Sequence, residues 1–421
     1  MRRLLSNSCA ALLSVSLWVP VILATASAQT APAEPGGDPG SANLAQTNPD
    51  EYAWRLFDFI NLQAAPSSAG VPASGKTITQ YDDDAATVWE TWALASGDGA
   101  GQEGSEVFKP DGSDPGAWAN LPRAIRPLKV FSINLKVASA VNESLGFGAR
   151  HTLPANKPAA GRVRPEILVG PGDPTGDFEV RLNQAAFEFT QKNELYNIEG
   201  LTAKFAAAKA AGNRDLIQFP PAAKEVKANW VTTTNPKAIS GDEKARYHWR
   251  QVGDTFYKLT GFHVTTKDLK QWFWADFAQE DFETTPGPAL ASRDSTTRGA
   301  TAPDRGTKDG ERKELVGSKW AHYRLRGTQI DFVDASNKPV IVGNTLIEAG
   351  RADKSSCMTC HFNASMAGVL SDGSLDTLSG GSFVVGPPNS AALGTGSTIK
   401  YLQNDFEWSA PFRAQHKTAH Q

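Results

Sequence analysis

The sequence predicts a single large α+β domain, with N-terminal helices, a central antiparallel β core with long loops, and a C-terminal helix carrying a C-x-x-C-H motif. Three observations support this fold class. Apolar residues recur at helical spacing in the first half of the chain, over residues 48–60 and 183–211. Strand-forming residues punctuated by glycines dominate after residue 215. No repeat of fixed period is visible, so we expect residues 48–421 to form one domain.

The first 28 residues have the pattern of a secretory signal peptide. Two arginines precede a mostly apolar run over residues 10–24, and an A-x-A cleavage site ends at Ala28. The apolar run is shorter than the roughly 20 residues that span a bilayer, and Pro20 interrupts it. We therefore expect cleavage, export to the periplasm or the medium, and no transmembrane anchor after cleavage.

The next elements are expected in the following order. Residues 29–47 are rich in Ala, Pro and Gly and predict a flexible lead-in. A helix should begin after Asn48, because Pro49 suits the first helical position and acidic residues follow it. Two tryptophans within residues 88–94 indicate a packed helical turn, and the Gly/Asp-rich residues 96–116 predict a long loop.

In the middle of the chain the spacing of apolar residues changes from helical to strand-like. The helical pattern over residues 183–211 should break near Gly200. Strands are expected over residues 215–219, 225–231 and parts of 247–265, followed by a long polar loop over 284–312 and a hairpin from 320–333 and 339–346. A final helix is expected over residues 347–366, before a Gly/Ser-rich stretch over 371–396.

The cysteines of the mature chain are both in one motif. Cys9 falls in the signal peptide, so only Cys357 and Cys360 remain, followed directly by His361. The spacing C-x-x-C-H is typical of c-type haem attachment. Each sulfur adds to one porphyrin vinyl group, so the two cysteines must lie about one helical turn apart, and the next histidine can bind the iron. The motif predicts one covalent haem c held by Cys357 and Cys360, with His361 as the proximal iron ligand.

Three other interpretations of the motif are weaker. A structural zinc site needs two further ligands, and the remaining histidines are scattered. A thioredoxin-like redox pair would follow an early strand at the head of a helix, whereas this pair lies near the C-terminus. A local disulfide would leave His361 unexplained.

The sixth iron ligand is harder to assign. Met366 follows His361 by five residues on the same expected helix, so it cannot readily reach the opposite haem face. The remaining options for the sixth position are a distant His, Lys or Tyr, or an iron with no sixth protein ligand. His263 is the first candidate for the distal pocket because it lies in an apolar stretch close to an aromatic cluster, although a core histidine bonded to backbone is the commoner case. His248 and His322 are weaker candidates.

Other residues could serve the haem in less specific ways. Lys267 and Arg413 could pair with haem propionates, although surface salt bridges are the simpler explanation. The tryptophans are expected mainly in the core and the lining of the haem pocket. A more specific alternative for Trp272, Trp274 or Trp408 is that it relays electrons or shapes an oxidant pocket.

Several short segments in order resemble an uncharacterised bacterial family of exported monohaem cytochrome c proteins. They include S-C-M-T-C-H at residues 356–361, G-N-T-L-I-E at 343–348, N-E-L-Y-N at 193–197, and D-F-E-W-S at 405–409. The resemblance implies haem, export and one integrated domain, and it leaves the substrate open. The chain departs from it at residues 275–279, where A-D-F-A-Q replaces a run of T-F-E-H type.

The composition limits the class of function. The formal net charge is −3 and no long Lys/Arg run occurs, which argues against a nucleic-acid partner. We expect a periplasmic monohaem c-type cytochrome that transfers electrons with a redox partner protein or a small-molecule oxidant or reductant. The alternatives are a haem enzyme with an open distal site, peroxidase-like or an oxidase of a small molecule, and a redox- or gas-binding protein. The large chain and the lack of a credible Met ligand favour the enzyme among these alternatives.

Overall fold

The computed structural model describes residues 42–82, 85–96, 104–122, 177–282, 294–295, 315–344, 347–348, 355–378 and 385–418. The expected signal peptide lies outside these residues, as does most of the expected loop over 284–312. Residues 104–116 of the other expected loop contain no helix or strand. Within the described part of the chain, no helix is both long enough and apolar enough to span a membrane.

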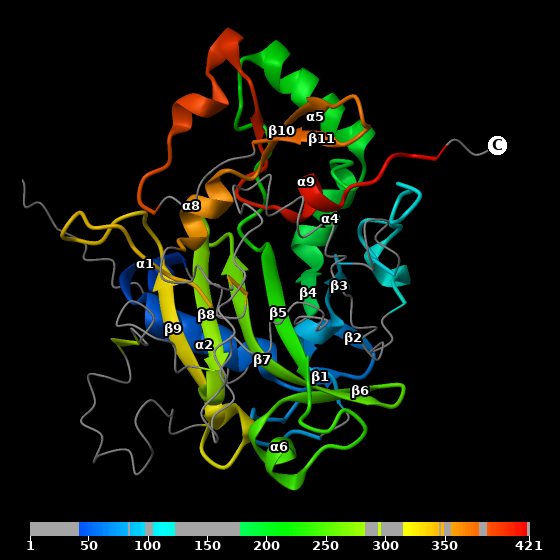
Figure 1. Ribbon diagram of the computed structural model, residues 1–421, viewed down its shortest axis with the longest axis vertical. Coiled ribbons are helices and arrows are strands. Elements are labelled where there is room, and N and C mark those ends of the chain that lie inside the picture. Colours follow the sequence, from blue (N-terminus) through cyan, green and yellow to red (C-terminus); the bar gives the residue numbers. More distant parts are fainter. Residues whose placement is uncertain are drawn as a thin grey trace, which may run out of the picture.

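The centre of the molecule is an antiparallel sheet of seven strands (Figure 1), as the α+β prediction requires. Its order is β3-β4-β5-β7-β8-β9, and β6 pairs with one end of β7. The strands are β3 (Ala93–Leu94), β4 (Asp177–Leu182), β5 (Lys224–Thr232), β6 (Trp249–Val252), β7 (Thr255–Thr266), β8 (Phe273–Gln279) and β9 (Tyr323–Gln329).

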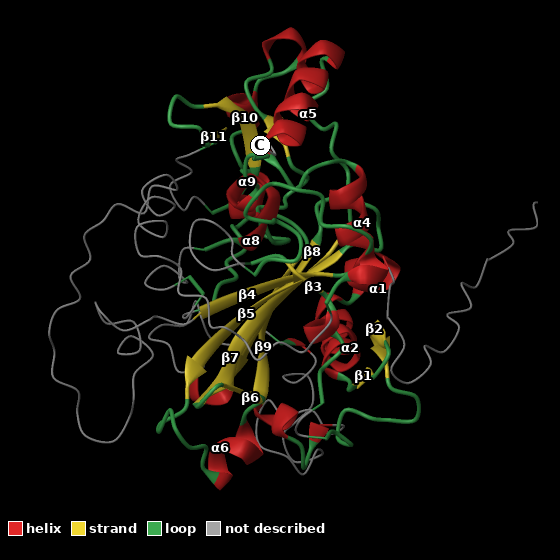
Figure 2. Ribbon diagram, turned by 90° about the vertical axis from the view of Figure 1, so that its right-hand side faces the viewer, coloured by secondary structure: helices red, strands yellow, loops and turns green. Residues whose placement is uncertain are grey.

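Helix α2 (Pro49–Asn61) covers the apolar face of this sheet (Figure 2). It begins after Asn48 with a proline and two acidic residues in its first turn, as predicted. Side chains alternate between the two faces of a strand, so Phe262 on β7 and its partner Phe277 on β8 point to the same face. The ring of Phe57 lies 5.8 Å from Phe262 and 4.8 Å from Phe277, which joins helix and sheet in one aromatic core.

The other elements surround this core. In the described part of the chain the remaining helices are α1 (Ala42–Thr47), α4 (Gln184–Lys192), α5 (Ile198–Ala211), α6 (Gly241–Arg246), α8 (Cys357–Phe362) and α9 (Ser409–Arg413). A small sheet of order β11-β10-β12 is formed by β10 (Ser365–Val369), β11 (Leu375–Thr377) and β12 (Leu402–Gln403), and β1 (Ala64–Ala65) pairs with β2 (Ser68–Pro72). The 3-10 helices within the described ranges are η1 (Trp89–Thr91), η2 (Trp118–Asn120), η4 (Glu280–Phe282), η8 (Lys319–His322), η10 (Ser390–Leu393) and η11 (Gly396–Thr398).

Two expectations in the first half of the chain need correction. The end of the expected lead-in forms α1, because Ala45 is fully buried against the core. The pattern over residues 183–211 does break into two helices, but before Gly200. Asn197 caps α5 by accepting a hydrogen bond from the Gly200 N–H, at 2.7 Å. A Cβ atom on Gly200 would lie 1.9 Å from the Glu194 carbonyl oxygen, so this glycine permits close packing and does not end a helix.

Three expectations near the candidate site also need correction. Residues 215–219 form no strand, and residues 339–344 make only isolated bridges, so the expected hairpin has one regular arm, β9. Among the described residues of the helix expected over 347–366, the helical ones are those of α8. This helix ends at Asn363, whose N–H bonds back to Cys360 O and His361 O. Met366 is therefore not on the motif helix: it is buried on β10, paired with Leu402.

Candidate functional site

Helix α8 presents the motif side chains on one face. Successive helical residues are rotated by about 100°, so Cys357, Cys360 and His361 fall within an arc of about 100°. All three are partly exposed, whereas the intervening Met358 and Thr359 are buried. One side of the helix therefore anchors it in the protein, and the other side displays two thiols and an imidazole.

Polar contacts fix α8 to the end of strand β9. Gln329, the last residue of that strand, donates from Nε2 to Ser356 Oγ at 2.9 Å and accepts from the Met358 N–H at 3.1 Å. Ser356 caps the helix by accepting a hydrogen bond from the Thr359 N–H. Thr359 Oγ1 donates to the Gly386 carbonyl at 2.7 Å. The motif is thus tied to the central sheet and to the segment that follows residue 384.

The ring of His361 has a defined orientation and tautomer. Its Nδ1 lies 2.7 Å from the carbonyl oxygen of Phe406, which can only accept, so Nδ1 carries the proton and Nε2 keeps its lone pair. The Trp274 ring packs against the imidazole with centroids 4.5 Å apart. Burial lowers the pKa of His361 to about 4, so the ring is neutral at pH 7. A neutral imidazole oriented by its second nitrogen is the form that binds metals.

A strained turn supplies the carbonyl that orients His361. Asp405 and Phe406 both have left-handed backbone conformations, with φ of 49° and 68°. Such non-glycine residues cost about 1–3 kcal/mol each and persist only where surrounding contacts hold them. Lys267 Nζ donates to Asp405 Oδ1 at 2.5 Å, and the Phe219 N–H donates to Asp405 Oδ2 at 2.7 Å. These buried contacts fix the turn that aims the Phe406 carbonyl at the imidazole.

A polar row crosses the central sheet on the face opposite α2. The register pairs Lys227 on β5 with His263 on β7, and His263 with Asp276 on β8. His263 Nε2 lies 3.4 Å from Asp276 Oδ1 and 3.5 Å from Glu348 Oε2. Asn344 donates from Nδ2 to Asp276 Oδ1 at 3.0 Å. We call His263, Asp276 and Glu348 the polar triad.

The low-dielectric surroundings shift the pKa values of all three members of the polar triad. Burial lowers the pKa of His263 well below its usual value, and Lys227 and His361 act in the same direction. Burial raises the pKa of Asp276 to about 6, against the hydrogen bond from Asn344. Burial also raises the pKa of Glu348 to about 8. Near pH 7 the triad therefore holds a neutral imidazole, a mostly ionised Asp276 and a mostly protonated Glu348.

The two cysteines are free thiols in the structure. Burial raises the pKa of Cys357 well above its usual value, with Glu348 and Asp276 adding to the shift. Burial and the Glu348 carboxyl raise the pKa of Cys360 to about 11. Both sulfurs are thus protonated and unbridged.

The residues present fit a covalently attached haem. Two free thiols lie one helical turn apart on the same face as a neutral histidine whose Nε2 is unprotonated. Two buried polar atoms of the polar triad, His263 Nε2 and Asp276 Oδ2, have no hydrogen-bond partner in the structure. Across the described ranges, no three His, Cys, Asp or Glu side chains are grouped to hold a bare metal ion.

The structure brings some predicted residues to the motif. His361 is one of the groups that lower the pKa of His263, and the Trp408 indole donates to the Cys360 carbonyl at 3.3 Å. Lys267 is committed to Asp405 rather than free for a propionate. Arg413 lies in the field of Glu225 and Glu407, and its Nε has no hydrogen-bond partner in the structure.

The two weaker histidine candidates lie at the opposite end of the sheet, near β6 and the start of β9 (Figure 1). His248 stacks on Trp320 with centroids 5.0 Å apart, and its Nε2 lies 3.2 Å from Glu90 Oε2. His322 Nδ1 lies 2.8 Å from Glu280 Oε1. Neither histidine belongs to the α8 site.

Sequence reasoning missed several residues of the site. Asp276 was visible only as part of a departure from the family pattern, and nothing singled out Lys227. The available signal was strand alternation: Lys227 lies between the apolar Val226 and Ala228 on β5. Glu348 and the Phe406 carbonyl come from loops, so no periodicity could place them.

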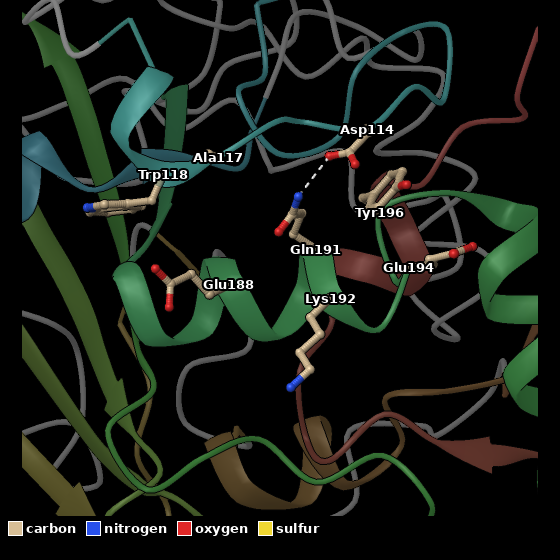
Figure 3. Close-up of a pocket in the computed structure, with 8 residues that line it drawn as sticks. All are labelled: Asp114, Ala117, Trp118, Glu188, Gln191, Lys192, Glu194 and Tyr196. Carbon is tan, nitrogen blue, oxygen red and sulfur yellow. Dashed lines mark hydrogen bonds between the residues drawn. The ribbon is translucent and has the colours of Figure 1, made fainter.

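A separate surface groove of about 510 Å³ lies along α4 (Figure 3). Trp118, Tyr196 and several charged side chains line it, and Gln191 donates to Asp114 Oδ1 at 3.1 Å. None of the α8 motif residues lines this groove.

No protein-family model, curated protein or solved structure matches the chain.

Proposed function

We propose that the chain is an exported, periplasmic monohaem c-type cytochrome that transfers electrons. Cys357 and Cys360 would hold one haem by thioethers, and His361 Nε2 would bind its iron. The observation that carries this proposal is the single face of α8, where two free thiols accompany a neutral imidazole held at Nδ1 by a backbone carbonyl.

The thiol chemistry argues against the main competing use of the motif. Catalytic C-x-x-C pairs depend on a cysteine whose pKa is lowered, so that the thiolate attacks. Here burial raises the pKa of both Cys357 and Cys360. Thioether formation consumes neutral thiols in an addition to vinyl groups, and it does not depend on a stabilised thiolate.

Each protein group then has a defined task. The bound haem would supply reversible one-electron oxidation and reduction of its iron. The Phe406 carbonyl fixes the rotation of the His361 ring and increases its electron density through the Nδ1 hydrogen bond. Trp274 packs against the same ring and limits its exposure to water.

The second candidate is a haem enzyme with an open distal site. A redox- or gas-binding protein would also have an open iron position. The polar triad favours the enzyme over a simple carrier, because an electron carrier has no need of three clustered ionisable groups, two of them buried, beside its attachment motif.

The experiment is to purify the protein from a host that matures c-type cytochromes and to extract it with acid acetone. We expect the haem to stay with the protein, and to be lost from the Cys357→Ala/Cys360→Ala variant.

Carbon monoxide added to the reduced protein then separates the candidates. Low-spin bands that do not change support the carrier, whereas a new carbon monoxide spectrum supports the enzyme or the gas-binding protein. Extraction of all haem from the wild type would refute the proposal.

A further inference from the structure

The polar triad contains buried atoms that lack partners in the described structure. His263 is 8% exposed and Asp276 is fully buried, yet His263 Nε2 and Asp276 Oδ2 make no hydrogen bond. Native proteins rarely leave such atoms unpaired, and those that do usually reserve them for water, a ligand or catalysis. The side chain of Glu348, beside His263, is 20% exposed, so the triad is within reach of solvent on one side.

The triad lies next to the proposed haem attachment. On β8, Asp276 is two residues from Trp274, so the two side chains share a face of the sheet about 7 Å apart. Trp274 is the residue whose ring packs on His361. Glu348 is also close enough to both Cys357 and Cys360 to affect their ionisation. The triad is therefore adjacent to the residues that would hold the haem.

The chemistry of the triad selects a class of ligand. A small anion would be repelled by the Asp276 carboxylate, and a small cation would meet the charge of Lys227 beside His263. A small neutral molecule with two hydrogen-bond donors fits the unpaired nitrogen and oxygen, which both accept, and the protonated Glu348 carboxyl can donate to it. An adjacent base and acid are most useful where a proton must move from one atom of such a molecule to the other as their bond breaks.

We propose that the polar triad is a catalytic acid–base site for the reduction of hydrogen peroxide, an inference that rests on the proposed haem function. His263 Nε2 accepts the proton of one peroxide oxygen, and Asp276 Oδ2 accepts a hydrogen bond that orients the molecule. The Glu348 carboxyl donates a proton to the other oxygen, which leaves as water when the O–O bond breaks.

The reaction balances with a one-electron donor, either a reduced redox protein or a small-molecule reductant. The remaining oxygen takes up two electrons and two protons to form the second water. One of these protons returns from His263 and the other comes from solvent, which also restores the proton on Glu348. Overall, one hydrogen peroxide, two electrons and two protons give two molecules of water.

The first test mixes the haem-loaded ferric protein with hydrogen peroxide and follows the main haem absorption band by stopped flow. We expect His263→Leu and Glu348→Gln each to lower the bimolecular rate constant by about 100-fold or more, the usual contribution of a positioned acid or base. His322→Gln, at the far end of the sheet, is the matched histidine control and should react at the wild-type rate.

A second measurement does not depend on turnover. Hydrogen cyanide binds ferric haem as a small acid that must give up its proton, so His263→Leu should slow cyanide binding while the resting spectrum stays unchanged. Glu348→Gln is nearly isosteric and keeps the test decisive if His263→Leu does not fold.

Two results would overturn the inference while the proposed haem function stands. Rate constants within about twofold of wild type in both variants would exclude a proton-transfer role of the size expected from such groups. A change of the resting spectrum from six-coordinate to five-coordinate in His263→Leu would make His263 an iron ligand instead of a base. Absence of covalent haem from the wild type is a different failure, because it removes the proposed function itself.

Discussion

At the scale of single residues, the site depends on one ion pair buried away from the motif. Lys267 is 7% exposed and Asp405 is 3% exposed, and their contact supports the turn whose Phe406 carbonyl holds His361. The ion pair is therefore a positioning device as well as a structural one.

Lys267→Met should test this device. Removing one partner of a buried ion pair typically costs about 3–5 kcal/mol, because the other charge is left unpaired. We expect a lower free energy of unfolding in denaturant titrations, together with a shifted haem reduction potential. The Lys267→Met/Asp405→Asn double variant should recover most of the stability. A single variant with wild-type stability and potential would contradict this role.

His361→Gly should separate haem attachment from iron ligation. The thioethers to Cys357 and Cys360 do not involve the imidazole, so covalent haem should remain while the axial ligand is lost. Added imidazole should bind in the vacated space and restore a spectrum close to wild type. A variant spectrum that equals wild type before imidazole is added would show that His361 is not the ligand.

The part of the site recognisable from sequence is the part with fixed local spacing. Cys357, Cys360 and His361 lie within about one helical turn, so the spacing alone predicts that they share a face of the helix. His263 could only be proposed as one of several histidines. Its neighbours Asp276 and Glu348 become visible only once the strand register and the loop over 344–348 bring them together.

At the scale of elements, the sequence predicted those with strong local signals. Helix α2 has a proline start, acidic first-turn residues and a continuous apolar face, and it forms as expected. Strand β5 likewise forms where the alternation of Val226, Ala228 and Trp230 predicts a strand. The helix expected over residues 347–366 is confirmed only at α8, and its expected end was wrong, because pairing of Met366 with Leu402 draws residues 365–366 into β10. Such tertiary contacts override weak helical propensity and leave no periodic signal in the sequence.

Gly200→Ala should show that packing, not a helix break, requires this glycine. The added methyl would meet the Glu194 carbonyl at 1.9 Å, a backbone atom that cannot move alone. Overpacking of this kind costs about 1–3 kcal/mol, which thermal or denaturant unfolding would detect.

Gly241→Ala is the matched control. This glycine is the first residue of α6, and an added Cβ there would meet nothing within 4 Å. We expect its stability to be unchanged or raised by up to about 1 kcal/mol, because alanine restricts the unfolded chain. Equal losses in the two variants would mean that the close approach at Gly200 does not matter.

At the scale of the whole molecule, a buried ionic network lies far from the motif, at the opposite end of the sheet. Arg250 Nε donates to Glu90 Oε1 at 2.8 Å, and His248 Nε2 lies 3.2 Å from Glu90 Oε2. Burial alone would raise the pKa of Glu90, but Arg250 and His248 hold it well below its usual value. Burial lowers the pKa of His248 to about 3.

This network should make stability fall with acidification. The unfolded chain protonates His248 near its ordinary pKa of about 6.5, whereas the folded protein does so only near pH 3. Stability is therefore lost as the pH falls through this interval, at about 1.4 kcal/mol per pH unit for one proton. Glu90 acts in the same direction below its ordinary value, because its pKa is depressed.

Denaturant titrations between pH 6 and pH 4 should detect the effect, and His248→Gln should remove its histidine part. His416→Gln is the contrasting variant. The hydrogen bond to Glu199 raises the pKa of His416, so its contribution is lost as the pH rises, and its removal should leave the acid slope in place. An unchanged slope in His248→Gln would contradict the assignment.

The most direct test of the whole account is the intact mass of the mature protein, made in a host that attaches haem and compared with Cys357→Ala/Cys360→Ala. We predict a wild-type mass that exceeds the polypeptide by one haem, with the addition located on the peptide that contains residues 357–361. A colourless protein with the mass of the bare polypeptide would contradict the central claim.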